Sequence, residues 1–341
     1  MSERVRDISE FDLIARLRDA LPESVRWSPE VRVGIGDDAA LWNAPPTQGV
    51  LVTTDSLIDS VHFRIDWTSW RDLGWKALAV NISDIAAMGG KPKLATVSLA
   101  LTGEELAASL VKLYRGMGAI ARKEGLVIAG GDIVRAPHDF GIHVTVLGNT
   151  RKGRYLARSG ARPGDLIAVT GTLGAAAAGL ALLSLADDDP RRKASTAPLL
   201  IAAHTRPQPR VQAGRLALEH RATAGMDLSD GLFGDLPKIL TASRVDATVD
   251  LAAIPVAAAV RALFPDRWLE LATRGGEDYE LLLTIPADRV SLLQEELAGI
   301  GQTLTVIGVI GSQSPDPTLY TRNEAGEVTP AIGGAFDHFR S

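Results

Sequence analysis

The feature that most constrains the fold of this chain is its alternation of apolar, strand-like runs with helical patterns. In the first half we expect strands at Val31–Val33, Val50–Thr53, Leu94–Leu101 and Ile142–Leu147. We expect helices between them over Asp72–Met88 and Gly103–Glu124. Gly89, Gly90 and Pro92 follow the first helix and are stop signals. The pattern predicts one α/β domain in residues 1–150.

The second half of the chain repeats this alternation. We expect a helix over Leu173–Leu185 and a hairpin turn at Asn323–Gly326. Strands are expected at Asp165–Thr170, Ala247–Leu251, Glu280–Ile285 and Thr303–Ile310. With 341 residues, 46% of them hydrophobic, the chain is long enough for two hydrophobic cores. We therefore expect a second α/β domain in residues 151–341.

The composition excludes several kinds of site and partner. There is no cysteine, which rules out disulfides, thiolate nucleophiles, zinc–thiolate sites and iron–sulfur clusters. The 36 basic and 41 acidic residues give a net charge of −5, and no Lys/Arg cluster forms a stripe. A nucleic-acid partner is therefore not expected.

Neither a membrane span nor a secretion signal is indicated. The longest apolar run, residues 174–186, is too short to cross a bilayer and ends at Asp187. The first residues lack a basic stretch before an apolar core, and Ser9 precedes an amphipathic helical pattern that it can cap. We expect a cytoplasmic protein that does not bind membranes.

An acidic motif recurs along the chain, where an apolar run ends in Gly or a hydroxyl residue and an aspartate follows. It occurs at Gly36-Asp37-Asp38, Thr53-Thr54-Asp55, Gly130-Gly131-Asp132, Met226-Asp227-Leu228-Ser229-Asp230-Gly231 and Gly275-Gly276-Glu277-Asp278, with Asn81-Ile82-Ser83-Asp84 inside a helix. Each instance alone is ordinary turn or cap chemistry. The set as a whole suggests that several carboxylates converge.

Converging carboxylates need cations. Two carboxylates about 4 Å apart repel by about 4 kcal/mol at an effective dielectric constant of 20. Hard oxygen ligands with little imidazole nearby favour magnesium, which fills its other positions with water and phosphate oxygens. The motif therefore predicts magnesium and a phosphate-bearing ligand together.

Familiar nucleotide motifs do not account for such a ligand. Gly34-Ile35-Gly36 imitates a dinucleotide fingerprint, but Asp37 and Asp38 place carboxylates where a pyrophosphate would lie. The chain also lacks a Gly-x-x-x-x-Gly-Lys-Ser/Thr loop and a His-Arg-Asp catalytic loop. If the protein uses ATP, another fold binds it.

Longer segments identify a family resemblance. They are Gly-Ile-Gly-Asp-Asp-Ala-Ala at 34–40, Thr-Thr-Asp-Ser-Leu at 53–57, Val-His-Phe at 61–63, the run from Gly-Trp-Lys to Met-Gly-Gly at 74–90, Met-Asp-Leu-Ser-Asp-Gly-Leu at 226–232 and Gly-Gly-Glu-Asp-Tyr-Glu-Leu-Leu at 275–282. Together they resemble the thiamine-monophosphate kinases of the aminoimidazole ribonucleotide synthetase superfamily. The resemblance covers nearly the whole chain.

The resemblance implies two α/β domains with mixed sheets, a homodimer joined through the N-terminal domains, and several Mg²⁺ ions with ATP as co-substrate. The implied magnesium ligands are Asp38, Thr53, Thr54, Asp55, Asp84, Asp132, Asp227 and Asp230. The implied ATP contacts are Tyr114, Gly131, Asp132, Arg158 and Ser229. The implied contacts to thiamine monophosphate are His62, Glu277 and Phe336. Asp55, Asp84 and Arg158 are the implied catalytic residues.

The expected reaction is phosphorylation of thiamine monophosphate to thiamine diphosphate. The accepting phosphate is already ionised near neutral pH, so in-line attack on ATP needs no general base. Selenophosphate-synthesising and hydrogenase-maturation relatives need a cysteine that this chain lacks. Aminoimidazole ribonucleotide synthetase and a non-catalytic nucleotide-binding protein stay open as alternatives. For the segment His204-Thr205-Arg206-Pro207 a structural turn is a sufficient explanation.

Overall fold

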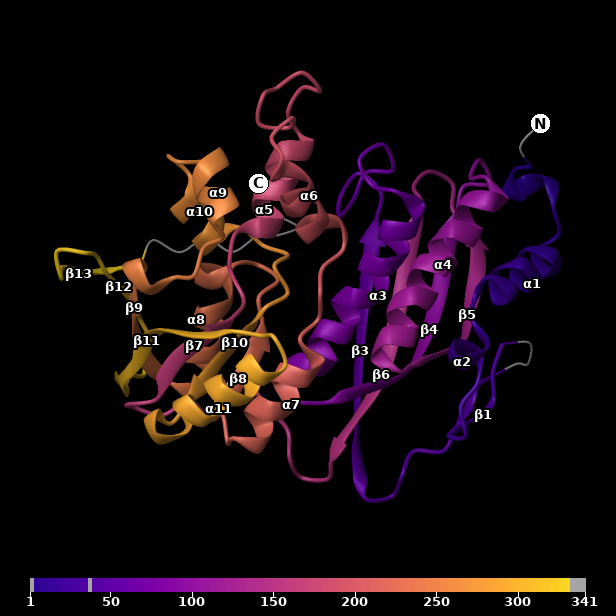
Figure 1. Ribbon diagram of the computed structural model, residues 1–341. Coiled ribbons are helices and arrows are strands. Elements are labelled where there is room, and N and C mark those ends of the chain that lie inside the picture. The colour runs from indigo at the N-terminus through magenta and orange to yellow at the C-terminus, as the bar shows by residue number, and fades with distance from the viewer. Residues whose placement is uncertain (1–2, 36–38, 332–341) are drawn as a thin grey trace. The chain divides into compact units, whose positions relative to one another are not determined.

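The structure is a computed structural model that describes residues 3–35 and 39–331, with Arg32 described by its backbone only. The chain folds into two compact units, which Figure 1 colours from indigo to magenta and from magenta to yellow. Unit 1 consists of Met1–Ile85 and Gly90–Arg154, and unit 2 of Ala86–Gly89 and Tyr155–Ser341.

Unit 1 is built on a four-stranded sheet with the strand order β3-β6-β4-β5. Its strands are β3 (Gln48–Ile58), β4 (Lys91–Leu101), β5 (Val127–Arg135) and β6 (Gly141–Arg151). The pair β4–β5 is parallel and the other two pairs are antiparallel, so the sheet is mixed. A separate two-stranded sheet pairs β1 (Val31–Val33) with β2 (Leu41–Trp42).

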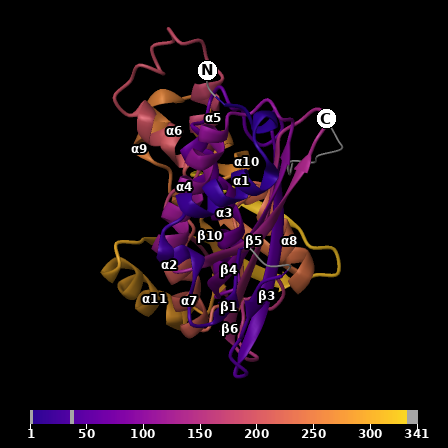
Figure 2. The same ribbon diagram turned by 90° about the vertical axis from the view of Figure 1, so that its right-hand side faces the viewer.

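Helices cover one face of the four-stranded sheet. They are α3 (Trp70–Ala87) and α4 (Ala107–Glu124), with α1 (Glu10–Ala20), α2 (Glu23–Arg26) and the 3-10 helix η1 (Val5–Asp7) at the N-terminal end. Figures 1 and 2, seen together, show α3 and α4 on the same side of the strands. A Cβ at Gly148 of β6 would lie 2.6 Å from Ile85 of α3, which identifies the covered face. Ile142, Val144 and Val146 share that face and are buried.

Local signals explain where the helices of unit 1 begin and end. The hydroxyl of Ser9 accepts a hydrogen bond from Asp12 N at 3.2 Å and caps α1 as predicted. The helix expected from Gly103 begins instead at Ala107. The reason is Glu105, whose carboxylate accepts hydrogen bonds from the backbone N–H groups of Thr102 and Gly103 at 3.0 and 2.9 Å and holds a loop there. Local side-chain bonds of this kind compete with helix formation.

Unit 2 contains a seven-stranded mixed sheet with the order β13-β12-β9-β11-β7-β10-β8. Its strands are β7 (Leu166–Thr170), β8 (Ala224–Asp227), β9 (Val245–Asp250), β10 (Leu281–Ile285), β11 (Leu304–Gln313), β12 (Leu319–Arg322) and β13 (Val328–Pro330). The pair β12–β9 is parallel and its neighbours are antiparallel. The predicted turn before Gly326 is confirmed, since it joins β12 to β13.

Helices pack on both faces of this second sheet. They are α5 (Ala175–Leu183), α6 (Ala197–Thr205), α7 (Val211–Glu219), α8 (Leu232–Ser243), α9 (Ala258–Leu263), α10 (Trp268–Arg274), α11 (Ala287–Gly299) and the 3-10 helix η2 (Leu251–Ala253). Leu282 of β10 joins the core beneath α8, whereas Leu281 and Leu283 join the core beneath α7 and α11. Alternate side chains of one strand thus enter two cores. A third cluster joins α5, α6, α9 and α10.

The expected α/β architecture with mixed sheets is confirmed in both units. Among the described residues, no helix has the length and hydropathy needed to span a membrane.

The crossing of α3 and α4 yields a prediction. A Cβ at Gly116 would lie 1.9 Å from the carbonyl oxygen of Arg71, so Gly116→Ala forces the two backbones apart. We expect a loss of about 1–3 kcal/mol or more in the free energy of unfolding, measured with urea. Gly49→Ala in β3 is the control, since its Cβ would meet only Thr150 at 3.8 Å. Equal stability of the two variants would contradict this packing.

Candidate active site

Two carboxylates and a hydroxyl come together in unit 1 between β3 and α3. Side chains alternate along β3, so Thr53 and Asp55 point toward the covered face, where α3 carries Asp84. The Thr53 hydroxyl donates a hydrogen bond of 2.5 Å to Asp84 Oδ2. All three residues are half-buried. We call this group the acidic pair, defined by Asp55 and Asp84.

The acidic pair has the electrostatic character of a cation site. Withdrawal from water, and then the charge of Asp84, raise the pKa of Asp55 to about 6. A carboxylate beside another carboxylate holds its proton more tightly unless a cation is present. Two carboxylates and a hydroxyl are hard oxygen donors that fit magnesium. The predicted association of Thr53, Asp55 and Asp84 is therefore present.

Thr54 and Asp132 lie on the opposite face of the same sheet. Thr54 donates a hydrogen bond to the carbonyl of Val144 at 3.1 Å and accepts one from Thr145 at 3.1 Å. Thr54 pairs with Thr145 of β6, and Asp132 pairs through Ser98 of β4 with His143 of β6. Thr145 and His143 are two residues apart on β6, so Thr54 and Asp132 share one face. Asp132 is exposed, and its Oδ1 accepts a 2.9 Å hydrogen bond from Ile133 N. Unit 1 thus divides the predicted ligands between two faces.

Other predicted residues of unit 1 occupy different environments. His62 follows β3 in a turn, and its Nδ1 accepts a 3.2 Å hydrogen bond from Ile58 N, so a neutral ring carries its proton on Nε2. Tyr114 is buried in α4, and this burial raises the pKa of its phenol. Gly131 approaches β4 so closely that a Cβ there would lie 1.9 Å from the Val97 carbonyl oxygen.

Unit 2 places its predicted metal ligands on one loop after β8. Asp227 ends that strand and is 5% exposed, and Ser229 and Asp230 follow it. The carboxylate of Asp235 in α8 accepts hydrogen bonds from the N–H groups of Ser229 and Asp230 at 3.0 and 2.9 Å. Lys238 donates to Asp230 at 2.6 Å and to Asp235 at 2.7 Å. The loop is thus held by an ionic network.

The sequence prediction missed Asp235 and Lys238. Their spacing of three residues in a helical pattern was the available signal, because side chains three apart are neighbours on a helix. Burial raises the pKa of Asp235, and Lys238 acts in the opposite direction. Replacing Lys238 would leave the fully buried carboxylate of Asp235 without its cationic partner.

The segment Gly275–Glu280 lies beside this loop. Glu277 N donates to Ser229 O at 2.9 Å, and a Cβ at Gly276 would lie 2.3 Å from the same oxygen. Glu277 and Tyr279 have φ values of 69° and 51°. Such left-handed backbone in residues with side chains costs about 1–3 kcal/mol and is concentrated at functional sites. Unit 2 thus brings Glu277 next to Ser229 and Asp230.

Arg158 is the predicted ATP contact that lies outside these groups. Arg158 lies in unit 2 with an exposed side chain, and its carbonyl accepts a 3.1 Å hydrogen bond from Ser243. Asp38 and Phe336 lie outside the described residues. Within residues 3–35 and 39–331, no three His, Asp or Glu side chains form a metal-binding cluster. Unit 1 thus carries the acidic pair between β3 and α3, and unit 2 carries Asp227 and Asp230 on the loop after β8.

Comparison with known proteins gives consistent results across the chain. Residues 36–150 match AIR synthase related protein, N-terminal domain, and residues 162–316 match AIR synthase related protein, C-terminal domain. The thiamine-monophosphate kinase of Escherichia coli (strain K12) is 42% identical over 337 residues, which cover 97% of this chain and 98% of that protein.

Solved structures agree with this result. The crystal structure of thiamine-monophosphate kinase from Stenotrophomonas maltophilia K279a is similar with a TM-score of 0.80 and 35% identity, covering 94% of this chain and 98% of that one. AaThiL complexed with AMPPCP and TMP has a TM-score of 0.74 and 29% identity, covering 99% and 100%.

The acidic pair makes a prediction about pH. Because the folded-state pKa of Asp55 lies near 6, above the ordinary value of 3.8, its contribution to stability is lost as the pH rises through 6. In EDTA, Asp55→Asn should raise the free energy of unfolding by about 1–2 kcal/mol at pH 7.5 and by less at pH 5. Asp19→Asn, at an exposed position in α1, should give no such gain. A variant no more stable than wild type at pH 7.5 would contradict the burial and repulsion that raise this pKa.

Proposed function

Since this chain belongs to the thiamine-monophosphate kinase family, we propose that it transfers the γ-phosphoryl group of ATP in line onto the phosphate of thiamine monophosphate. The product is thiamine diphosphate. The observation that carries the proposal is the acidic pair with its hydroxyl neighbour Thr53. Because the reaction consumes ATP, we place the enzyme in the cytoplasm.

The hard oxygen donors of the chain fit several magnesium ions. Asp55, Asp84 and Thr53 would hold magnesium in unit 1, and Asp227 and Asp230 would do so in unit 2. Asp38, Thr54 and Asp132 complete the proposed ligand set. Magnesium bound there offsets negative charge on the phosphate oxygens of the two substrates.

The remaining residues position two anions that repel each other. The acceptor phosphate is ionised near neutral pH, so the site needs no side chain to remove a proton. We propose that the exposed guanidinium of Arg158 neutralises charge on ATP and on the transferred group. Lowering this repulsion lets the reacting atoms approach, which is the main task of a phosphoryl-transfer site.

Two further sets of residues select the substrates. We propose that Tyr114, Gly131, Asp132 and Ser229 contact ATP together with Arg158. His62, Glu277 and Phe336 would contact thiamine monophosphate. His62 can donate from Nε2, because its Nδ1 is already an acceptor. Glu277 offers a carboxylate to the cationic ring or an N–H group of the substrate.

A direct assay tests the function. The purified protein is incubated with ATP and magnesium, and with thiamine monophosphate or free thiamine, with and without EDTA, and the thiamine esters are separated by chromatography. Thiamine diphosphate should form only from the monophosphate and only without EDTA. Asp84→Asn should lower turnover by at least about a hundredfold, since a ligand that stabilises transition-state charge is lost.

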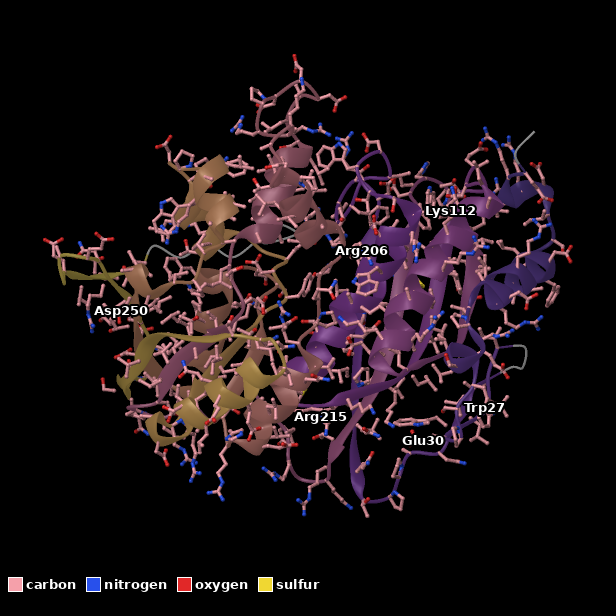
Figure 3. The ribbon with its side chains drawn as sticks, in the orientation of Figure 1. Trp27, Glu30, Lys112, Arg206, Arg215 and Asp250 are labelled. Atoms are coloured by element: carbon pink, nitrogen blue, oxygen red, sulfur yellow. The ribbon has the colours of Figure 1, made fainter. Side chains whose placement is uncertain are left out.

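Asp250→Asn is the matched control for this variant. Asp250 lies at the end of β9 (Figure 3), where it pairs with Arg322 at 3.1 Å. Its replacement by Asn should leave turnover unchanged. No product from folded wild-type protein would favour aminoimidazole ribonucleotide synthetase or a non-catalytic nucleotide-binding protein. Near-wild-type turnover of Asp84→Asn would remove Asp84 from the site.

We also propose that the enzyme is a homodimer joined through the N-terminal domains. Three valines on the sheet face opposite α3 support this, since Val50, Val52 and Val134 are 48%, 66% and 46% exposed. They lie on β3 and β5, the two edge strands of the sheet, and exposed apolar side chains on a sheet face are typical of an interaction surface. A second copy would bury them.

This proposal predicts the mass in solution. Val52→Lys should shift sedimentation from dimer to monomer, because an ammonium group would be buried at the interface. Folding should be nearly unaffected, because the side chain is exposed within one copy. Val328→Lys in β13, at a position 51% exposed in unit 2, should leave the dimer intact. A wild-type monomer at micromolar concentration would refute the proposal.

A further inference from the structure

We propose that His204 is a positioning residue that orients the carboxylate of Glu277 for binding thiamine monophosphate. The proposal rests on the proposed function, because it takes Glu277 as a contact to that substrate. His204 lies in the last turn of α6 and begins the segment His204-Thr205-Arg206-Pro207, for which the sequence indicated only a turn.

A short contact joins the two side chains. His204 Nδ1 lies 2.9 Å from Glu277 Oε2. Nδ1 makes no well-aligned hydrogen bond within the described structure, so Glu277 is its partner at ion-pair distance. The side chain of His204 is 6% exposed, whereas that of Glu277 is 25% exposed. The imidazole is therefore the buried member of the pair, and the carboxylate is the member that a ligand can reach.

The other two carboxylates of the segment are committed to structure. Asp278 accepts hydrogen bonds from the N–H groups of Gly174 and Ala176 at 2.6 and 3.0 Å, at the N-terminus of α5. Glu280 is 4% exposed and accepts from Thr170 at 2.6 Å. Glu277, whose side chain is 25% exposed, is the acidic residue of this segment that the proposed function assigns to the substrate.

The segment that begins at His204 holds this acidic loop at two points. Arg210, at the start of α7, donates to Glu280 through Nε at 2.7 Å and also through its terminal nitrogen. His204 contacts the loop at Glu277, three residues earlier. The Arg210 contact is a forked ion pair in a buried position, which fixes the loop backbone. The His204 contact acts on a side chain and not on the backbone.

A glutamate side chain that makes no other contact can point its carboxylate in many directions. The side chain has three rotatable bonds, and ordering it on binding lowers affinity. The backbone of Glu277 is already fixed, with φ of 69° and its N–H bonded to Ser229 O. The imidazole adds a contact at Oε2 that limits how the carboxylate can turn. Residues behind a binding group commonly set its direction in this way.

The test compares KM values for thiamine monophosphate and for ATP. His204→Asn places an amide nitrogen near the position of Nδ1 and should stay within about threefold of wild type for both substrates. His204→Gln places its amide near the position of Nε2 and should raise KM for thiamine monophosphate about tenfold, with little change for ATP. His204→Leu should match the Gln variant. If the Leu variant does not fold, the comparison of Asn with Gln decides.

Two controls separate this proposal from the function on which it rests. His220→Leu breaks a second His–Glu pair, in which His220 Nε2 lies 3.1 Å from Glu296 Oε1, and should change neither KM. Glu277→Gln should raise KM for thiamine monophosphate, and adding His204→Leu to it should have less than about a twofold further effect.

The outcomes are distinct. An unchanged KM for thiamine monophosphate in Glu277→Gln would overturn the proposed role of Glu277, and the role of His204 with it. A raised KM in that variant, with equal values for His204→Asn and His204→Gln or with multiplying effects in the double variant, would overturn the positioning role alone.

Discussion

The approach of α3 to β3, which brings the carboxylate of Asp84 beside that of Asp55, is the contact on which the proposed chemistry of this protein depends. Two like charges stay together only where the surrounding packing leaves no alternative. Here α3 meets α4 at Gly74 and Gly116, where no Cβ could be accommodated. Ile85 of α3 packs on Gly148 of β6. Close-packed helices and strands resist the shift that would separate the two carboxylates.

In unit 2 several acidic side chains are paired with cationic side chains of the protein. Asp230 and Asp235 share Lys238, and Glu280 has Arg210, so these carboxylates have cationic partners within the protein. The pairs are partly or fully buried, which makes each partner costly to remove. Their effect is to hold two loops in place. Rigid support of this kind is what accurate placement of a ligand requires.

A kinase that joins two phosphates needs placement more than acid–base chemistry. The donor and the acceptor are both anions, so the enzyme has to reduce their repulsion and align them. The carboxylates proposed to hold magnesium, an exposed arginine and a carboxylate held in a fixed direction fit that need. Membership in the thiamine-monophosphate kinase family and this arrangement of side chains support the same reaction.

The sequence by itself predicted about half of the elements and the candidate residues, but not the strands β5 and β8 or the helices α6 to α11. Apolar periodicity, glycine stops and caps such as Ser9 are local signals, so the predicted helices and strands agree with the structure apart from ends like that of α4 at Ala107. Family motifs identified the acidic residues because such motifs are contiguous in the chain. Glu105 moved the start of α4 through hydrogen bonds that periodicity does not reveal.

Only the tertiary structure decided how these residues are used. Strand pairing places Asp55 and Asp132 on opposite faces of one sheet, although their motifs look alike in sequence. Contacts with distant helices commit Asp278 to a helix N-terminus and leave Glu277 beside His204. Register and packing join residues far apart in the chain, and the energy of such contacts depends on burial and distance. A local sequence motif reveals neither the burial of a side chain nor its distance from residues elsewhere in the chain.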